Sequence, residues 1–211
     1  MSGSKTADKT RPSKRQLEIR LGSLKLLEKP NLKLEQYPVS SEAASELLYM
    51  AGFEHDDLER RVVDIGTGTG RLAIGAALMG AKKVVGVDID KDSLAIAKEN
   101  AKTAAVRVQW VQSEIERVKG KFDAVIMNPP YGTRTTHADT RFLEKALQLA
   151  PVVYSIHKSS TREFLLKFLK KLGAQVSQVR SMKMTIPHLF EFHEKRQAIV
   201  EIDLYRIIQE R

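Results

Sequence analysis

Four consecutive residues, Asn128-Pro129-Pro130-Tyr131, have the types and order needed to hold a planar amino group. The Asn128 side-chain oxygen and the Pro129 carbonyl can each accept one hydrogen bond from an NH2 group. The two prolines restrict the backbone and fix both acceptors, and Tyr131 offers a ring on which a base can stack. Two acceptors on one NH2 group leave its nitrogen lone pair available to attack an electrophile. The tetrad alone would also fit an ordinary strand end, because Asn and Pro are common in turns.

A glycine-rich loop lies earlier in the chain. The apolar run 61–65 leads into Gly66-Thr67-Gly68-Thr69-Gly70, and an apolar helical pattern follows until Gly80. A strand, a glycine loop and a helix in this order allow the backbone to approach a nucleotide-like ligand closely. Together with Asp64, the alternating glycines depart from the dinucleotide pattern. The resulting D-x-G-x-G-x-G is similar to the first motif of S-adenosylmethionine-dependent methyltransferases.

An acidic residue, Asp88, ends the next apolar run, Val84-Val85-Gly86-Val87. A carboxylate about 20 residues beyond a glycine loop can accept hydrogen bonds from both ribose hydroxyls of a nucleoside. The tetrad, the loop and the acid each fall at a predicted strand end and in the order expected of a methyltransferase. Three independent matches favour that class over a chance nucleotide-binding fold.

The elements that must position these motifs predict an α/β fold, the Rossmann-like class I methyltransferase type. The first five expected strands alternate with helices, which implies a mostly parallel sheet, and the last two form a β-hairpin. The seven strands are expected at 61–65, 84–88, 106–111, 122–127, 151–156, 174–181 and 196–208.

We expect one methyltransferase domain, residues 14–211, with its Rossmann-like core at 61–211. Residues 1–13 are polar and basic, which predicts a disordered tail. In the segment 14–50, helices are expected at 14–27 and from Ser40 or Ser41 to Met50, with a stretch that caps the cofactor. Ser160 and Glu163 have the spacing of a capping box before a helix at 164–172.

Composition excludes several classes of protein. The chain has 211 residues, enough for a doubly wound sheet, and no cysteine, so disulfides and thiolate metal sites are impossible. Its five histidines show no i,i+4 pair, and no metal site is expected. No apolar run reaches 18 residues, and the start of the chain lacks an apolar signal segment. We therefore expect a soluble, cytoplasmic protein without a membrane span.

The formal net charge of +9 is unevenly distributed. Residues 1–29 hold 8 Lys and Arg against 3 Asp and Glu, and residues 157–196 hold 9 against 3. Two basic segments flanking a nearly neutral centre suggest a polyanion bound on both sides of the active-site mouth. The alternative is a solvated surface without a partner.

Several stretches resemble the methyltransferase-like protein 5 family, and most closely an archaeal-type member. They are Leu34-Glu35-Gln36-Tyr37-Pro38, the run 125–133 around the tetrad, the run 154–163, and Phe192-His193-Glu194-Lys195. The resemblance implies N6-methylation of one adenosine in small-subunit ribosomal RNA. It also implies S-adenosyl-L-methionine as cofactor and a small zinc-ribbon activator protein as heterodimer partner. Two positions depart from the family, Glu114 where Asp is usual and Val39 where Thr is usual.

The motifs and the resemblance together give the expected site residues. Asn128, Pro129, Pro130 and Tyr131 would hold the adenine. The expected cofactor contacts are Gln36, Val39, Asp64, Gly66, Gly68, Thr69, Gly70, Asp88, Ile89, Glu114, Ile115 and Asn128. The expected RNA contacts are Lys14, Arg15, Arg134, His157, Lys158 and Lys195.

Other functions stay open at this point. A protein glutamine N5-methyltransferase would use the same tetrad, because a glutamine amide is also planar. A DNA adenine-N6 methyltransferase and a non-catalytic ribosome-assembly factor are further options. For the activator, the strand 106–111 is expected at a sheet edge, where its unpaired backbone groups could bind a partner strand.

Overall fold

The computed structural model describes residues 11–28, 31, 37–130, 138–187 and 197–209. These residues form a seven-stranded sheet in the order β3-β2-β1-β4-β5-β7-β6. The first five strands pair in parallel, and β7 lies antiparallel between β5 and β6. The predicted α/β fold with a mostly parallel sheet and a C-terminal hairpin is confirmed.

The strands agree with the sequence pattern except at their ends. Their bounds are β1 Arg61–Ile65, β2 Lys83–Asp88, β3 Gln109–Gln112, β4 Ala124–Met127, β5 Val152–Lys158, β6 Ala174–Pro187 and β7 Gln197–Gln209. The third strand is shorter than predicted, because residues 106–108 lie outside it. Pairing with β7 extends β5 to Lys158, three residues beyond its last partner on β4, where Met127 pairs with Ser155.

The helices fill the connections between strands. They are α1 Lys14–Gly22, α2 Ser41–Tyr49, α3 Arg71–Leu78, α4 Lys91–Thr103, α5 Ala138–Leu149 and α6 Arg162–Lys171. Short turns are the π-helix Met50–Glu54 and the 3-10 helices Ile115–Arg117 and Ser159–Thr161. No helix within these described ranges has the length and apolarity to cross a membrane.

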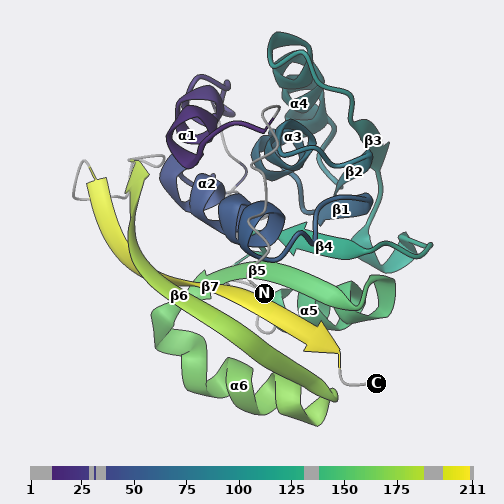
Figure 1. Cartoon of the computed structure of the whole chain (residues 1–211), viewed down its shortest axis with the longest axis vertical. Coiled ribbons are helices and arrows are strands. Elements are labelled where there is room, and N and C mark those ends of the chain that lie inside the picture. Colours follow the sequence, from purple (N-terminus) through teal and green to yellow (C-terminus); the bar gives the residue numbers. More distant parts are fainter. Residues whose placement is uncertain (1–10, 29–30, 32–36, 131–137, 188–196, 210–211) are drawn as a thin grey trace, which may run out of the picture.

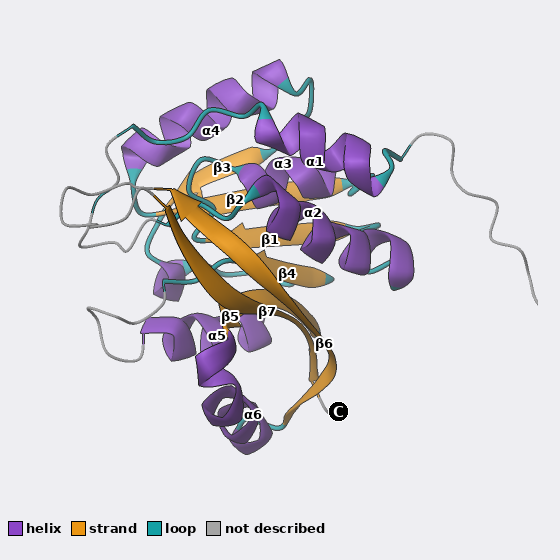
Figure 2. Ribbon diagram, turned by 90° about the vertical axis from the view of Figure 1, so that its left-hand side faces the viewer, coloured by secondary structure: helices purple, strands orange, loops and turns teal. Residues whose placement is uncertain are grey.

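Two layers of helices enclose the sheet (Figures 1 and 2). Helices α1 to α4 lie on one side, and α5 and α6 lie on the other. Successive residues of β1 divide between two apolar cores, because side chains alternate across a strand. Val62 packs with the α1–α4 side, and Val63 packs with the α5–α6 side. The carboxyl ends of the parallel strands therefore meet at one edge between the two layers.

Local side chains explain where several helices begin. Ser40 accepts a hydrogen bond from the Ala43 N–H at the start of α2, as predicted, and Asp90 caps α4. Helix α1 starts with a capping box between Ser13 and Gln16 that the sequence analysis missed. It ends at Gly22 rather than Leu27.

Two other predictions are wrong. No capping hydrogen bond joins Ser160 and Glu163, since a 3-10 turn precedes α6 and Thr161 stands at its N-cap. The predicted disorder is also wrong for residues 11–13. Arg11 donates to the Gly52 carbonyl at 2.6 Å and pairs with Glu59 at 3.1 Å. Residues 1–10 lie outside the described residues.

Candidate active site

A cavity of about 400 Å³ opens at the carboxyl edge of the sheet. Its walls come from the segments that follow β1, β2, β3 and β4, from α5, from Leu26 and Leu27, and from residues 37–39. Among the predicted site residues, those that line it are Val39, Asp64, Gly66, Gly68, Thr69, Asp88, Ile89, Glu114, Ile115, Asn128 and Pro130. The fold thus brings residues from five separate segments of the chain, each predicted to contribute to the site, to one chamber.

The glycine loop and Asp88 form one hydrogen-bonded unit. The Gly68 N–H donates to Asp88 Oδ2 at 2.7 Å, and the Asp90 N–H donates to Asp88 Oδ1 at 2.9 Å. Gly68 has φ +54, a conformation that favours glycine. A carboxylate has about four acceptor positions, so Asp88 can still accept from two hydroxyls. Burial raises the pKa of Asp88, and these backbone donors oppose that shift.

Gly70 has a different role from the one predicted. It does not line the cavity, and a Cβ at this position would lie 2.6 Å from the Trp110 ring. A Cβ at Gly86 on β2 would lie 2.4 Å from the same ring. Both glycines therefore make room for Trp110 beneath the loop, which makes Gly70 a packing residue in this structure.

Asp64 is a buried carboxylate with one unused oxygen. Its side chain is 1% exposed, and Oδ2 accepts from Thr67 Oγ1 at 2.6 Å and from the Ala73 N–H at 3.0 Å. Oδ1 has no protein partner. Burial raises the pKa of Asp64 to about 7, although the two donors act in the opposite direction. An unpaired buried carboxylate on a cavity wall is suited to bind a cationic ligand group.

Asn128 presents one oriented acceptor. Its Nδ2 donates to the Tyr37 carbonyl at 3.1 Å, which fixes the direction of the amide. The opposite atom, Oδ1, is buried without a hydrogen-bond partner, and Asn128 lines the cavity. Pro129 is buried beside it. Leaving a buried acceptor unpaired costs roughly 1–3 kcal/mol, so this oxygen is matched to a donor from outside the chain.

Arg71, the first residue of α3, contributes a buried cation that the sequence analysis missed. It is 8% exposed and lines the cavity, and its Nη1 donates to the Val39 carbonyl. Its Nε has no hydrogen-bond partner. Burial lowers the pKa of Arg71. No motif marked this residue, because it lies just beyond the glycine pattern.

The far end of the cavity is formed by residues around the 3-10 turn 115–117. Glu114 pairs with Arg117 at 3.0 Å and leaves its side chain half exposed, while Ile89 is 49% exposed. Phe142 of α5 lies against Gly66, where a Cβ would be 2.9 Å from its ring. An aromatic ring, two isoleucines and a carboxylate suit a purine base with an exocyclic amine. Phe142 belongs to no motif, and its helical spacing predicts only a core position.

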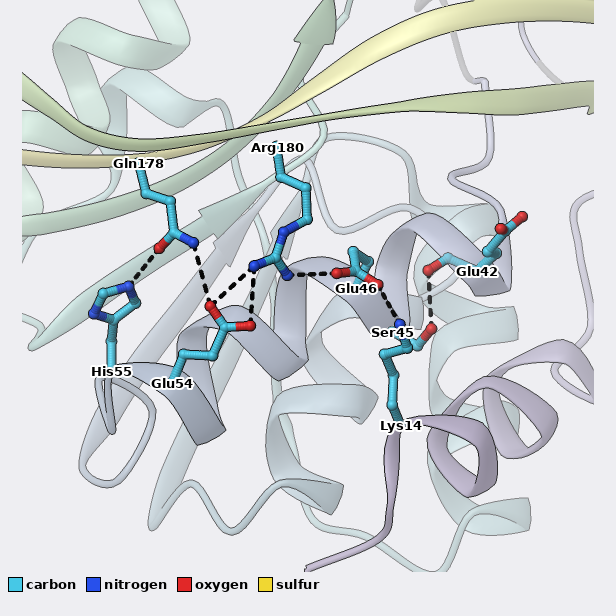
Figure 3. A network of polar contacts seen from close by, with 8 residues as sticks. All are labelled: Lys14, Glu42, Ser45, Glu46, Glu54, His55, Gln178 and Arg180. Atoms are coloured by element: carbon cyan, nitrogen blue, oxygen red, sulfur yellow. Dashed lines mark hydrogen bonds and ion pairs between the residues drawn. The ribbon is translucent and has the colours of Figure 1, made fainter.

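The predicted RNA contacts differ in whether their charge is already paired within the protein. Lys14 pairs with Glu46 at 2.6 Å, and Glu46 also pairs with Arg180 in a network that joins α1, α2 and β6 (Figure 3). Lys14 is therefore committed to an intramolecular pair. Arg15 is exposed, and Lys158 is partly exposed.

The expected phosphate contact of His157 is wrong for this structure. His157 is 2% exposed, its Nε2 lies 2.7 Å from Ser155 Oγ, and its ring packs edge-on against Tyr205. Burial lowers the pKa of His157 to about 3, so the ring is neutral. Gln36, Tyr131, Arg134 and Lys195 lie outside the described residues.

The chamber fits a nucleoside that carries a charged amino-acid tail. Asp88 can accept from ribose hydroxyls, and the 114–116 wall can take the base. Asp64 Oδ1 and Arg71 Nε are buried polar atoms without hydrogen-bond partners, they belong to side chains of opposite charge, and both residues line the cavity. Asn128 Oδ1 remains for a third group, the substrate that is to react. Within the described residues, no cluster of three His, Asp or Glu could hold a metal ion.

Comparison with known proteins agrees with this chemistry. A family model described as ribosomal protein L11 methyltransferase matches residues 48–129, a range that contains the glycine loop and ends at the first proline of the tetrad. A protein N5-glutamine methyltransferase candidate from Methanocaldococcus jannaschii is 39% identical over 50% of this chain and 54% of its own length. Both matches are partial.

Other relatives match almost the whole chain, including the following two. The rRNA N(6)-adenosine-methyltransferase METTL5 of Danio rerio is 34% identical over 91% of this chain and 97% of its own length. A Pyrococcus horikoshii crystal structure, solved as a candidate RNA methyltransferase, is 38% identical with a TM-score of 0.88. That match covers 95% of this chain and 99% of the Pyrococcus chain. The chain belongs to the methyltransferase-like protein 5 family of rRNA N6-adenosine methyltransferases.

Proposed function

We propose that this enzyme transfers a methyl group from S-adenosylmethionine to N6 of one adenosine in small-subunit ribosomal RNA. The observation that carries the proposal is the unpaired, buried Asn128 Oδ1, which is held in place by the Tyr37 carbonyl and faces the cofactor chamber. An acceptor in this position selects a substrate that brings an N–H donor. A cytoplasmic location is part of the proposal.

The reaction follows from what each group binds. The cofactor supplies an electrophilic methyl group on a sulfonium. Asn128 Oδ1 and the Pro129 carbonyl accept the two N6 hydrogens of an adenine that has left its helix or loop. Tyr131 stacks on the base, and the diproline keeps both acceptors fixed, so that N6 is held in line with the methyl group. We assign no general base, and the N6 proton leaves to solvent after transfer.

Protein glutamine N5-methylation is the alternative that shares this acceptor geometry. Only half of the chain matches the glutamine methyltransferase candidate, whereas the adenosine methyltransferase relative matches nearly all of it. The full-length match therefore favours adenosine. DNA adenine methylation and a non-catalytic assembly role remain as outcomes of the experiment below.

The RNA would be bound beside the strand end that carries the tetrad. Lys158 lies at the carboxyl end of β5, next to the residues that follow β4, and Arg15 is exposed on α1. Cations at these positions can contact phosphates without reading sequence. We include Arg134 and Lys195 in this proposal on the basis of the family resemblance.

A zinc-ribbon activator is the proposed protein partner, bound at the edge strand β3. This strand has one neighbour, β2, so its outer backbone groups are available for pairing. Trp110 packs over Gly70 and Gly86 and is not part of the proposed contact. On the opposite face, Val111 and Phe122 help to line a second cavity of about 270 Å³ beside β3. Arg61, Lys83, Arg117 and Lys119 line the same cavity, so a partner strand at this edge would cover a surface that is both apolar and basic.

One assay tests the function. The purified chain, with and without a co-expressed activator, is incubated with methyl-labelled cofactor and, in parallel reactions, ribosomal RNA, DNA or ribosomal protein. The nucleosides and the protein hydrolysate are then analysed for label. We expect label in N6-methyladenosine and more of it with the activator. Label in methylglutamine, label in DNA only, or RNA binding without any product would refute the proposed reaction. Hydrogen exchange that leaves residues 109–112 unprotected in the complex would refute the activator site.

A further inference from the structure

Arg71 stands apart from the residues that hold the nucleoside. It follows the glycine loop, is 8% exposed, and lines the same chamber as Asp64 and Asn128. Its guanidinium carries five N–H donors, of which Nη1 binds the Val39 carbonyl, while Nε has no partner. A buried guanidinium with an unpaired donor is costly unless an anion completes its hydrogen bonding.

The other unpaired charged atom of the chamber has the opposite sign. Asp64 Oδ1 is buried and unpaired, while Asp64 Oδ2 binds Thr67 and the Ala73 N–H. Ala73 is two residues after Arg71 in the first turn of α3, so the two charged groups are held by the same short segment. Because both residues line the same chamber, their unpaired atoms offer it one acceptor for a cation and one donor for an anion.

We infer that Arg71 binds the carboxylate of the cofactor's amino-acid tail, while Asp64 binds its ammonium. The inference rests on the proposed cofactor. Arginine suits this role because its planar fork of donors matches a carboxylate, and it keeps its charge when buried. Arg71 thus makes the chamber selective for adenosyl ligands that carry an α-carboxylate.

A second reading gives Arg71 a purely structural task. Its bond to the Val39 carbonyl anchors segment 37–39, and the Tyr37 carbonyl of that segment orients Asn128. Loss of the anchor would disturb every ligand to the same degree. Loss of a carboxylate contact would instead affect only ligands that have the carboxylate. The two readings therefore differ in a ratio of affinities.

The experiment measures two dissociation constants by titration calorimetry on the full chain. The probes are S-adenosylhomocysteine and its decarboxylated analogue, which keeps the adenosine, the thioether and the amino group. The wild-type chain should bind the carboxylated probe about 10- to 100-fold more tightly, the range expected for a hydrogen bond to a charged group. In Arg71→Leu that ratio should fall to about twofold or less, and Arg71→Lys should restore part of it.

Arg141→Leu is the matched control. Arg141 also lines the chamber, but it pairs with Glu116 and its side chain is 60% exposed. Its removal should leave the ratio unchanged. Equal loss of both probes in Arg71→Leu, or a wild-type ratio near one, overturns the carboxylate assignment while leaving the methyltransferase intact. Failure of the wild-type chain to bind either probe refutes the cofactor itself.

Discussion

Two buried aspartates at opposite sides of β4 show how the same residue type serves two purposes. Asp64, at the end of β1, is 1% exposed and has one oxygen without a partner. Asp203, on β7, is 0% exposed and accepts from Arg162, Ser159, Ser181 and Tyr205. Asp64 is matched to a ligand, whereas Asp203 is already satisfied by the protein.

The titration of the two groups follows from this difference. Burial raises the pKa of both carboxyls, but the donors around Asp203 reverse the shift and lower its pKa to about 2. At Asp64 the pKa stays raised, at about 7. An incompletely paired buried charge therefore marks the ligand-binding edge of this sheet, and a fully paired one marks the scaffold.

Replacing Asp203 tests the scaffold side and should have the largest effect. Asp203→Ala removes the shared acceptor of Arg162 and three hydroxyls. Arg162 is 43% exposed and can be hydrated, so the loss comes from the buried donors left unpaired, at about 1–3 kcal/mol of unfolding free energy for each. Urea unfolding measures it, with Asp123→Ala as control, since Asp123 is partly exposed and accepts from the Arg61 N–H. A loss below about 1 kcal/mol, the usual size of an ordinary hydrogen bond, would show that the Asp203 network does not stabilise the fold.

Replacing Asn128 tests the ligand side at the reacting atom. Asn128→Ala removes a preorganised acceptor, which should cost about 3 kcal/mol of transition-state stabilisation, or on the order of a hundredfold in kcat. Affinity for S-adenosylhomocysteine should change little, because Asn128 faces the substrate more than the cofactor. Single-turnover methylation and calorimetry measure the two quantities. Near-normal turnover would exclude the proposed role.

Asp64→Asn should separate ligand binding from stability. Asn can still accept from Thr67 and Ala73, but it has no charge for the ligand's ammonium, so affinity for S-adenosylhomocysteine should fall about tenfold or more.

Asp64 has a raised pKa in the folded protein, so its contribution to stability is present below about pH 4 and is lost as pH rises toward 7. Urea unfolding from pH 4 to pH 7 should show this decline in the wild type and not in Asp64→Asn. An identical pH profile in the two proteins would contradict the raised pKa.

The smallest expected effect concerns the RNA surface. Arg15→Ala removes an exposed cation and should reduce the slope of log K against log salt for RNA binding by about one unit. Lys14→Ala is the matched neighbour, and its ion pair with Glu46 predicts a smaller change. Equal slopes for wild type and Arg15→Ala would show that Arg15 on α1 does not contact the RNA.

Motifs at strand ends were the part of this site that the sequence could predict. The glycine loop, Asp88 and Asn128 are short local patterns, and parallel strands necessarily bring their carboxyl ends together. Arg71 and Phe142 could not be recognised, because helical spacing marks such residues only as part of a helix. The Tyr37 carbonyl is a backbone group without a sequence signal of its own.

The wrong predictions for His157 and Ser160 both lie where β7 pairs with β5. His157 has the appearance of a polar strand end, but the antiparallel pairing of β5 with β7 covers it with Tyr205. Ser159 is drawn to Asp203, which is distant in sequence, and the predicted capping box at Ser160 does not form. Contacts between residues so far apart along the chain leave no local pattern to read.

The most direct test of the whole account is a map of N6-methyladenosine in small-subunit ribosomal RNA from cells with and without this gene. We predict that one adenosine loses its methyl group in the deletion strain. Expression of the wild-type chain should restore the methyl group, and expression of Asn128→Ala should not. An unchanged map in the deletion strain, or full restoration by Asn128→Ala, would contradict the account.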